Sequence, residues 1–301
     1  MSNLKDFSIL VTGARGFLGS VVMAYLKQHG ARVIGIGRPP LSQDTQGLIA
    51  VDLEELGALK ALDLTGPYDV VIHCAALLPG KRSDLEVLIA NQRMTHNLLQ
   101  WAVNAGVSHL LFASGCNIYG YSNRPCAEST LPDPPNYYAV SKLACEYLVS
   151  LAAKSAGMRV CTLRISAPYG PHLRAETVVK RFILQAARKE PITLMGSGSR
   201  SQDFVYEEDV ARAFALAILH GVTGTFNISS NRSVSMRELA ETILRLFGIR
   251  PEDAIRLEGI DPQEEYRGRY PISAAIKAFG YRPQVTLEEG LRRTAEAWGL
   301  L

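Results

Sequence analysis

The 301-residue sequence lacks the features that mark secreted, metal-binding and membrane-spanning proteins. It has only five cysteines, an odd number without CxxC spacing, which argues for reduced thiols rather than a disulfide framework. Its six histidines show neither an HExxH motif nor another paired-ligand spacing, so we expect no metal site. No apolar run is long enough to cross a bilayer, and residues 1–7 have no signal-peptide core. These absences predict a soluble cytoplasmic protein.

An excess of charge of one sign is missing as well. The chain has 32 basic and 29 acidic residues, spread along its length without a basic stripe. We therefore expect neither nucleic acid nor a membrane as a partner. With 47% hydrophobic residues, a chain of this length can bury one large core or two modest ones.

Short apolar runs alternate with stretches of helical length through the first half of the chain. The runs predict buried parallel strands at residues 8–11, 32–36, 48–51, 70–73, 110–113 and 160–163. Helices are predicted at residues 17–29, 54–62, 83–104 and 138–156. This alternation is typical of an α/β protein with a Rossmann-like, doubly wound parallel sheet.

After residue 170 the pattern becomes mixed. Helices are predicted at residues 177–189, 235–247 and 286–298, and short strands at residues 204–206 and 225–228. We expect a dinucleotide-binding domain with the catalytic helix over residues 1–170 and a smaller, mixed α/β substrate-binding region over residues 171–301. Some strands or helices are expected to cross this boundary, and a cleft between the two parts would favour ligand binding.

Three glycines follow the first predicted strand, at positions 13, 16 and 19. Gly13 permits a tight turn, Gly16 lets the backbone approach a pyrophosphate, and Gly19 allows close packing of the next helix. The N-terminus of that helix favours negative charge. The loop predicts a dinucleotide cofactor, with further contacts from Arg15, Phe17 and Leu18.

Arg38 stands at the end of the second predicted strand, where NAD-preferring proteins usually carry a carboxylate. A guanidinium there suits a 2′-phosphate through charge-assisted hydrogen bonds, and Arg15 can reach the same group. We therefore expect NADP(H) to be preferred, with NAD(H) possible; alternatively, Arg38 covers the adenine or points to solvent. Asp52, beside Leu53, is either an acceptor for the adenine amino group or a helix N-cap.

A tyrosine and a lysine stand four residues apart in the segment Tyr138-Ala-Val-Ser-Lys142. On one helix they share a face, so the ammonium can favour the charged form of the phenol. Tyr138 then becomes usable as an acid and a base near neutral pH. Tyr137 cannot take this role, because the residue four positions further on is Ser141.

With these motifs, the chain resembles the extended short-chain dehydrogenase/reductase family of nucleotide-sugar epimerases, dehydratases and 4-ketoreductases. The resemblance also rests on residues 69–76, Asn91 with Thr95, residues 118–120, Arg164 with residues 169–171, and residues 203–206 with Asp209. It implies that Tyr138 exchanges a proton with the substrate oxygen and that Lys142 holds the nicotinamide ribose. It implies a homodimer formed through helices 83–104 and 138–156. Further cofactor contacts are expected from Cys74, Ala75, Ala76, Asn91 and Ile165.

The chain departs from the family pattern at the position four residues before Tyr119. The family normally has a Ser or Thr there that hydrogen-bonds the reacting oxygen, and this chain has Gly115. The flanking Ser114 and Cys116 would point away in an extended segment, unless a bulge re-aims one of them. We name Ser114 as the candidate catalytic hydroxyl, and expect Cys116 and Asn117 near the substrate.

Two positions that bind the diphosphate in nucleotide-sugar members are also changed, to Ala167 and Gln202. Both changes weaken the case for a nucleotide diphosphate substrate. Arg200, Arg267 and Arg269 remain as cations for a phosphate, or are solvated surface charges. The predicted substrate-binding residues are Cys116, Asn117, Ala167, Arg200 and Arg267.

Three functions remain open. The first is an NADPH-dependent ketoreductase of a sugar or nucleotide sugar, and the second is an epimerase that retains its cofactor. Dehydration is disfavoured, because Cys116-Asn117 does not supply the Asp-Glu pair that family dehydratases commonly carry. The third is a weakly catalytic dinucleotide-binding sensor, which only Gly115 supports.

Overall fold

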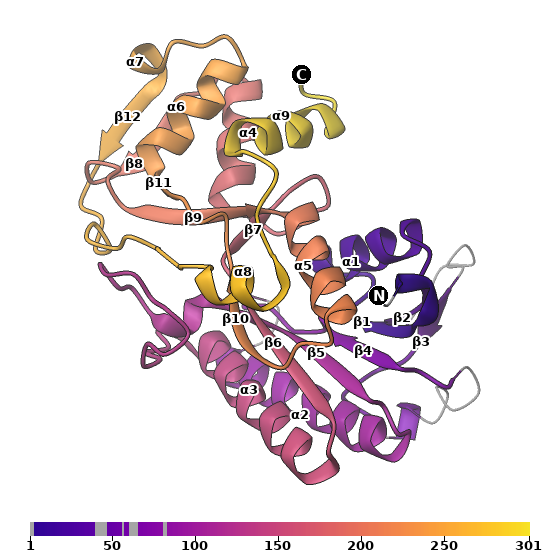
Figure 1. Ribbon diagram of the computed structural model, residues 1–301. Coiled ribbons are helices and arrows are strands. Elements are labelled where there is room, and N and C mark those ends of the chain that lie inside the picture. Colours follow the sequence, from indigo (N-terminus) through magenta and orange to yellow (C-terminus); the bar gives the residue numbers. More distant parts are fainter. Residues whose placement is uncertain (1–2, 40–46, 56, 60–65, 81–82) are drawn as a thin grey trace.

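The computed structural model describes residues 3–39, 47–55, 57–59, 66–80 and 83–301. Its centre is a sheet of seven parallel strands in the order β10-β6-β5-β4-β1-β2-β3, seen in Figure 1. The strands are β1 (Ser8–Thr12), β2 (Arg32–Gly37), β3 (Leu48–Ala50), β4 (Val70–His73), β5 (His109–Gly115), β6 (Arg159–Ile165) and β10 (Gly224–Ile228). The predicted Rossmann-like sheet is confirmed.

Helices cover both faces of this sheet because side chains alternate along its buried strands. In β1, Ile9 and Val11 face a core shared with α1 (Phe17–Gln28) and α5 (Glu207–Leu219), whereas Leu10 faces α2 (Asp84–Asn104) and α3 (Tyr137–Ala156). Figure 1 shows α1 and α5 on one side of the sheet and α2 and α3 on the other. Of the helix predicted at residues 54–62, residues 56 and 60–62 lie outside the described part of the chain.

A smaller part with its own core lies above the carboxyl edge of the sheet in Figure 1. There β9 (Ser201–Tyr206) pairs with β11 (Ser233–Ser235) and β7 (Ala167–Tyr169), and β8 (Ile192–Met195) pairs with β12 (Ile255–Glu258). The helices around these strands are α4 (Val178–Ala187), α6 (Met236–Leu246), α7 (Pro251–Ala254) and α9 (Leu287–Ala297). Phe182, Leu239 and Leu291 join α4, α6 and α9 in the core of this part.

The chain passes between the two parts more than once. β7 precedes residue 170 yet pairs in the smaller part, whereas β10 follows it and pairs with β6 in the large sheet. α8 (Ser273–Phe279) then packs against β10, with Phe279 in the core of the large sheet. The division at residue 170 stays a prediction about folding units, with strands that cross it in both directions.

Candidate active site

The glycine loop joins β1 to α1 at the carboxyl edge of the sheet. Gly13 has a φ of +67°, and a Cβ there would lie 2.7 Å from the backbone nitrogen of Ala75, so only glycine fits. A Cβ on Gly19 would lie 2.2 Å from the carbonyl oxygen of Gly13. The N-terminus of α1 therefore sits directly against the loop, as a site for a pyrophosphate requires.

This loop is one wall of a pocket of about 260 Å³. Of the residues predicted to bind the cofactor, the lining includes Gly13, Arg15, Gly16, Arg38, Asp52, Leu53, Cys74, Ala75 and Ala76. They come from the ends of β1, β2 and β4 and from the segment after β3. Separate stretches of sequence thus converge on one site whose glycine cradle fits a dinucleotide.

Four other residues predicted to bind the cofactor are not among those that line this pocket: Phe17, Leu18, Asn91 and Ile165. Phe17 packs against the core of the smaller part, and Leu18 against the core that α1 shares with α5. Asn91 is buried in α2, where its carboxamide binds the backbone of Leu77 through bonds of 2.7 and 3.1 Å. Ile165 is buried at the end of β6. Asn91 therefore holds a lining residue of the pocket in place.

Arg38 lies between two carboxylates at the rim of the pocket. Its Nη2 lies 3.5 Å from Glu54 Oε1 and its Nε lies 3.9 Å from Asp52 Oδ2. Arg15 donates a 2.8 Å hydrogen bond to the carbonyl oxygen of Arg38, which brings the second guanidinium to the same rim. Asp52 Oδ1 also accepts from the backbone nitrogen of Glu54. The rim therefore carries both signs of charge.

Tyr138 and Lys142 share one face of α3. Asn136 caps this helix by accepting from the backbone nitrogen of Ala139 at 2.9 Å. Lys142 is buried; its Nζ donates a 2.8 Å hydrogen bond to the carbonyl oxygen of Ala113 and lies 5.8 Å from the centroid of the Tyr138 ring. Contact with the strand thus fixes the ammonium beside the phenol at the carboxyl edge of the sheet.

His73 ends β4 and is buried between two threonines. Its ring nitrogens lie 2.8 Å from Thr12 Oγ1 and 3.0 Å from Thr95 Oγ1. Burial, with a smaller contribution from the charge on Lys142, lowers the pKa of His73 to about 3, so the ring is neutral. Thr12 Oγ1 also accepts from the backbone nitrogen of Ala75, which ties the histidine to the wall of the cofactor pocket.

The residues on either side of Gly115 each bind a buried partner. Ser114 Oγ donates to Glu146 Oε1 at 2.5 Å, and Cys116 Sγ donates to the carbonyl oxygen of Arg164 at 3.1 Å. The sequence analysis missed Glu146, although its place four residues after Lys142 puts it on the same helical face. The catalytic role of Ser114 stays a prediction, because its hydroxyl has a partner of its own.

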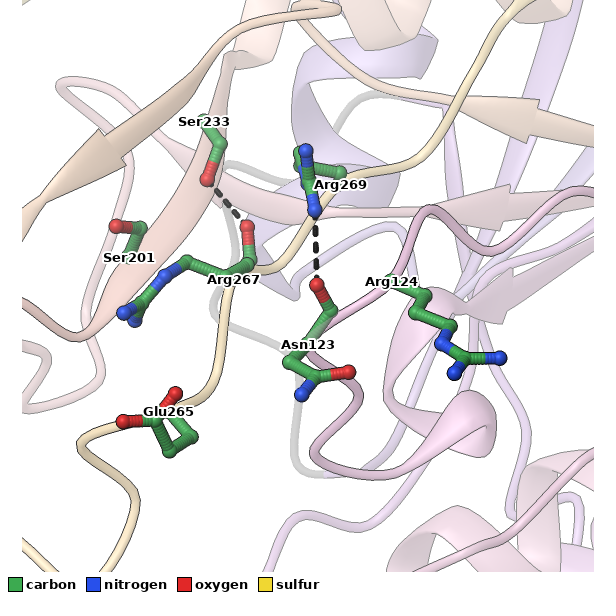
Figure 2. A pocket seen from close by; sticks show the side chains of 7 residues that line it. All are labelled: Asn123, Arg124, Ser201, Ser233, Glu265, Arg267 and Arg269. Atoms are coloured by element: carbon green, nitrogen blue, oxygen red, sulfur yellow. Dashed lines mark hydrogen bonds between the residues drawn. The ribbon is translucent and has the colours of Figure 1, made fainter.

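A second pocket, of about 610 Å³, is lined by the loop at residues 123–124, by β9 and β11, and by the segment at residues 265–269. Figure 2 shows its lining, which consists of Asn123, Arg124, Ser201, Ser233, Glu265, Arg267 and Arg269. Arg269 donates to the carbonyl oxygen of Asn123 at 2.8 Å, and Ser233 donates to that of Arg267. Three guanidinium groups and one carboxylate make this pocket suitable for an anion.

The predicted substrate residues are not all part of this pocket. Arg267 lines it, but Arg200 is held elsewhere by an ion pair with Asp261 (3.2 Å) and a hydrogen bond to Gln263 (2.9 Å). Ala167 lies in β7, and Asn117 lies in the short helix η3 (Cys116–Tyr119). The sequence analysis missed Asn123, Arg124, Ser201, Ser233 and Glu265. These residues come from four separate loops and strands, and no spacing along the chain links them.

A glycine loop, a parallel sheet and a Tyr-Lys helix in this arrangement define an extended short-chain dehydrogenase/reductase. The chain belongs to the NAD dependent epimerase/dehydratase family, whose family model matches residues 9–229. Within the described residues, no helix has the length and apolar character needed to span a membrane. The same residues contain no cluster of three His, Cys, Asp or Glu side chains suited to a metal ion.

The chain is similar to enzymes that act on nucleotide sugars. It is 28% identical to the UDP-glucuronate 4-epimerase of Thermodesulfobacterium geofontis, over 95% of this chain and 94% of that protein. It is also 28% identical to a dTDP-4-dehydro-6-deoxy-D-allose reductase of Streptomyces sp, over 97% of this chain and 96% of that protein. Another relative, a trifunctional UDP-glucose 4,6-dehydratase/epimerase/reductase of Arabidopsis thaliana, is 28% identical over 98% of this chain, which spans only 48% of its length.

The chain is also similar to solved structures of such enzymes. The UDP-glucose 4-epimerase of Thermotoga maritima with UDP-glucose has a TM-score of 0.88 at 25% identity, over 97% of this chain and 98% of that one. The UDP-glucose 4-epimerase of Thermus thermophilus in complex with NAD has a TM-score of 0.84 at 27% identity, over 97% of this chain and 99% of that one.

Proposed function

We propose that the chain is an NAD(P)(H)-dependent redox enzyme acting on a hydroxyl or keto group of a sugar or nucleotide sugar, and specifically an NADPH-dependent ketoreductase. The observation that carries this proposal is the position of Lys142. Its buried ammonium is fixed by Ala113 beside the Tyr138 ring, at the edge of the sheet where the cofactor pocket opens. A phenol next to a fixed cation is suited to proton exchange with a substrate oxygen.

Each part of the site has a role in this reaction. The glycine loop and the residues that line the smaller pocket hold the dinucleotide, which supplies or accepts the hydride when bound. Tyr138 gives a proton to the substrate oxygen during reduction and takes it back during oxidation. Lys142 lies beside the phenol ring and would hold a ribose hydroxyl of the cofactor. Ser114 takes part only if its hydroxyl gives up the hydrogen bond to Glu146 and donates to the substrate oxygen instead.

The preference for NADP(H) is supported by the two guanidinium groups at the rim of the cofactor pocket. Arg15 and Arg38 together suit a 2′-phosphate, although Asp52 and Glu54 lie close to Arg38 and oppose a further negative charge. Calorimetric titration with NADPH and NADH tests the proposal. We expect NADPH to bind at least tenfold more tightly and Arg38→Ala to remove most of that difference, with Arg93→Ala as the control. Tighter binding of NADH would refute the preference.

An epimerase with a retained cofactor is the second candidate. The epimerase of known structure with a TM-score of 0.88 favours it, as do the carboxylates beside Arg38, which suit ribose hydroxyls. Purified protein incubated with UDP-glucose and no added cofactor distinguishes the two. Formation of UDP-galactose supports the epimerase, whereas consumption of NADPH by a 4-keto nucleotide sugar supports the reductase.

The substrate's anionic group is proposed to bind in the larger pocket. Arg267 and Arg269 line it from one segment and Arg124 from another, so they can replace the phosphate ligands missing at Ala167 and Gln202. Arg200 would support this pocket indirectly by tying the segment at residues 261–263 to β9. We expect Arg269→Gln to weaken UDP-glucose binding by at least tenfold, as measured by calorimetry.

A homodimer is proposed to form through α2 and α3. These helices expose Leu85 (54%) and Ile89 (44%) on α2, and Tyr147 (64%) and Leu151 (61%) on α3. The two helices pack side by side, so their exposed apolar side chains can form one docking face. A cytoplasmic location is also proposed, because all five cysteines are free thiols.

A further inference from the structure

Two segments that line the larger pocket, residues 122–126 and 265–271, carry its three guanidinium groups and are hydrogen-bonded to each other. The backbone nitrogen of Cys126 donates to the carbonyl oxygen of Arg269 at 2.9 Å. The side chain of Arg269 donates in turn to the carbonyl oxygen of Asn123 at 2.8 Å, as Figure 2 shows. The two segments therefore form one unit, the arginine clip.

The arginine clip is held by a side chain of β10, the strand at the end of the large sheet. Asn227 is fully buried and is not among the residues that line the pocket. Its Nδ2 donates to the carbonyl oxygen of Cys126 at 2.9 Å, in one segment of the clip, and to that of Pro271 at 3.3 Å, in the other. One carboxamide thus bridges the two segments that carry the guanidinium groups.

A buried chain of donors fixes the orientation of this carboxamide. Arg164 Nη1 donates to the hydroxyl of Tyr119 at 2.8 Å, and a guanidinium can only donate. The proton of the Tyr119 hydroxyl needs a different acceptor, and Asn227 Oδ1 lies 2.8 Å away. The end of the amide that faces Tyr119 is therefore the oxygen, and the amino group must face the two carbonyls of the arginine clip.

Neighbouring contacts fix the same region to β10. The backbone nitrogen of Asn227 donates to Glu128 Oε1 at 2.8 Å, just beyond the first segment of the clip. Ser229 Oγ donates to the carbonyl oxygen of Tyr270 at 2.8 Å, in the second segment. The larger pocket is therefore built onto the sheet through β10.

We propose that Asn227 is a positioning residue for the substrate's anionic group, which sets the spacing of the three guanidinium groups without touching the substrate. The proposal rests on the proposed anion site in the larger pocket and deepens it, since it identifies what holds that site in shape. Three like charges repel one another while the anion is absent, so their segments need an anchor. A neutral carboxamide provides one without competing with the anion for the guanidinium groups, as a carboxylate would.

Two probes test the two pockets separately. UDP-glucose is the probe for the larger pocket, and NADPH, or NADH if it binds more tightly, is the probe for the cofactor pocket. We expect Asn227→Ala to weaken UDP-glucose binding about tenfold in calorimetry and to change cofactor binding by less than about twofold. With a 4-keto nucleotide sugar, KM should rise by a similar factor while kcat stays within about twofold, because the anion site is disturbed and Tyr138 is not.

Asn97→Ala is the matched control for a loss of stability. Asn97 is also a buried carboxamide that donates a 2.9 Å hydrogen bond to a backbone carbonyl, but that carbonyl belongs to Leu53, which lines the cofactor pocket. We expect both variants to melt at a lower temperature than the wild type, and Asn227→Ala alone to weaken UDP-glucose binding. Wild-type affinity for UDP-glucose in Asn227→Ala, or equal weakening in both variants, would overturn the proposal.

A milder variant applies if Asn227→Ala does not fold. Tyr119→Phe keeps the ring and removes the hydroxyl that orients the amide, so UDP-glucose binding should weaken about threefold. With Asn227→Ala unfolded, unchanged UDP-glucose binding by Tyr119→Phe would overturn the proposal.

Failure of the anion site and failure of the positioning role give different results. If Arg269→Gln weakens UDP-glucose binding and Asn227→Ala does not, the anion site stands and the role of Asn227 is wrong. If Asn227→Ala weakens binding and Arg269→Gln does not, the guanidinium groups are not the ligands, and both proposals are overturned. A wild type that does not bind UDP-glucose overturns both as well.

Discussion

Ser114 donates a 2.5 Å hydrogen bond to Glu146, which lies one helical turn beyond Lys142 on α3. Glu146 also accepts hydrogen bonds from the buried guanidinium of Arg164, the shortest of 2.7 Å. The strand that ends beside the reacting groups is thus anchored to the helix that carries them. This contact gives Ser114 a structural partner at the position nearest to the missing family hydroxyl.

Replacement of Ser114 tests whether that hydroxyl is catalytic. Ser114→Ala removes one hydrogen bond to a charged group, so we expect a loss of about 2 kcal/mol in the free energy of unfolding. Hydride transfer should stay within about threefold of the wild-type rate if Glu146 is the true partner. A fall of 10²-fold or more, typical of a lost oxyanion donor, would instead establish Ser114 as catalytic. Single-turnover consumption of NADPH with a keto sugar gives the rate, and urea titration gives the stability.

Loss of Glu146 should be far more damaging. Glu146→Ala leaves the Arg164 guanidinium buried without its carboxylate, which costs about 3–5 kcal/mol. The double variant Glu146→Ala/Arg164→Met should be more stable than Glu146→Ala, because it removes the uncompensated charge. Equal stability of the two variants in urea would show that the ion pair is not what holds α3 to β6.

Gly19 should tolerate no side chain. Gly19→Ala places a Cβ 2.2 Å from the carbonyl oxygen of Gly13, so α1 must move away from the loop. We expect destabilisation of about 1–3 kcal/mol and a dinucleotide affinity at least tenfold lower. Gly57→Ala is the control, because its Cβ meets nothing within 4 Å and its φ is not positive. Normal cofactor binding by Gly19→Ala in calorimetry would contradict the cradle described here.

Acid should destabilise the protein through His73. Burial lowers the pKa of His73 to about 3, from its ordinary value of 6.5. Between these two pH values the unfolded chain binds a proton at His73 and the folded chain does not. The contribution of His73 to the free energy of unfolding is complete above pH 6.5 and is lost as the pH falls towards 3. At pH 5 the free energy of unfolding should be about 2 kcal/mol lower for this reason. His73→Gln should reduce the pH dependence of unfolding by that amount. An unchanged slope between about pH 7.5 and pH 5 would contradict a neutral, buried His73.

Asp203 has the opposite effect to His73 on the pH dependence of stability, over the range from about pH 3.8 to pH 6. Burial raises the pKa of its carboxyl from 3.8 to about 6, even though Ser230 and Ser166 donate hydrogen bonds to it. Its folded form takes up a proton more readily than its unfolded form, so this contribution is present below pH 3.8 and lost as the pH rises through 6. Asp203→Asn should therefore steepen the acid destabilisation relative to the wild type.

The docking face on α3 can be tested by charge. Tyr147→Glu and Leu151→Glu each place a carboxylate on a side chain that is more than 60% exposed in the single chain. If the helices pair as proposed, either change should convert the dimer to a monomer, because an unpaired charge would be buried in the interface. Ile260→Glu, on a side chain that is 84% exposed outside these helices, is the control. Light scattering after gel filtration reports the mass, and an unchanged dimer in both variants would place the interface elsewhere.

Most strands of the larger sheet can be predicted from local sequence, because they are short apolar runs separated by helices. The order of the motifs along the chain then indicates the fold. The position of β10 cannot be predicted in this way, since its pairing joins Gly224 to Cys161 across 63 residues and leaves no periodic signal. The same limit applies to the sites. The glycine loop and the Tyr138/Lys142 pair are local patterns, whereas the larger pocket depends on which loops and strands meet in space.

During synthesis, β10 is translated well after β6, the strand with which it pairs. A nascent chain that has emerged only as far as residue 170 has made β6 but not its outer neighbour, so β6 is an unprotected sheet edge during that interval. The edge is covered only once Gly224–Ile228 has left the ribosome, after β7, α4, β8 and β9 of the smaller part have been translated. A cell that makes this protein must therefore keep an incomplete sheet from aggregating while the rest of the chain is translated, and a fragment cut at residue 170 would carry the same hazard permanently.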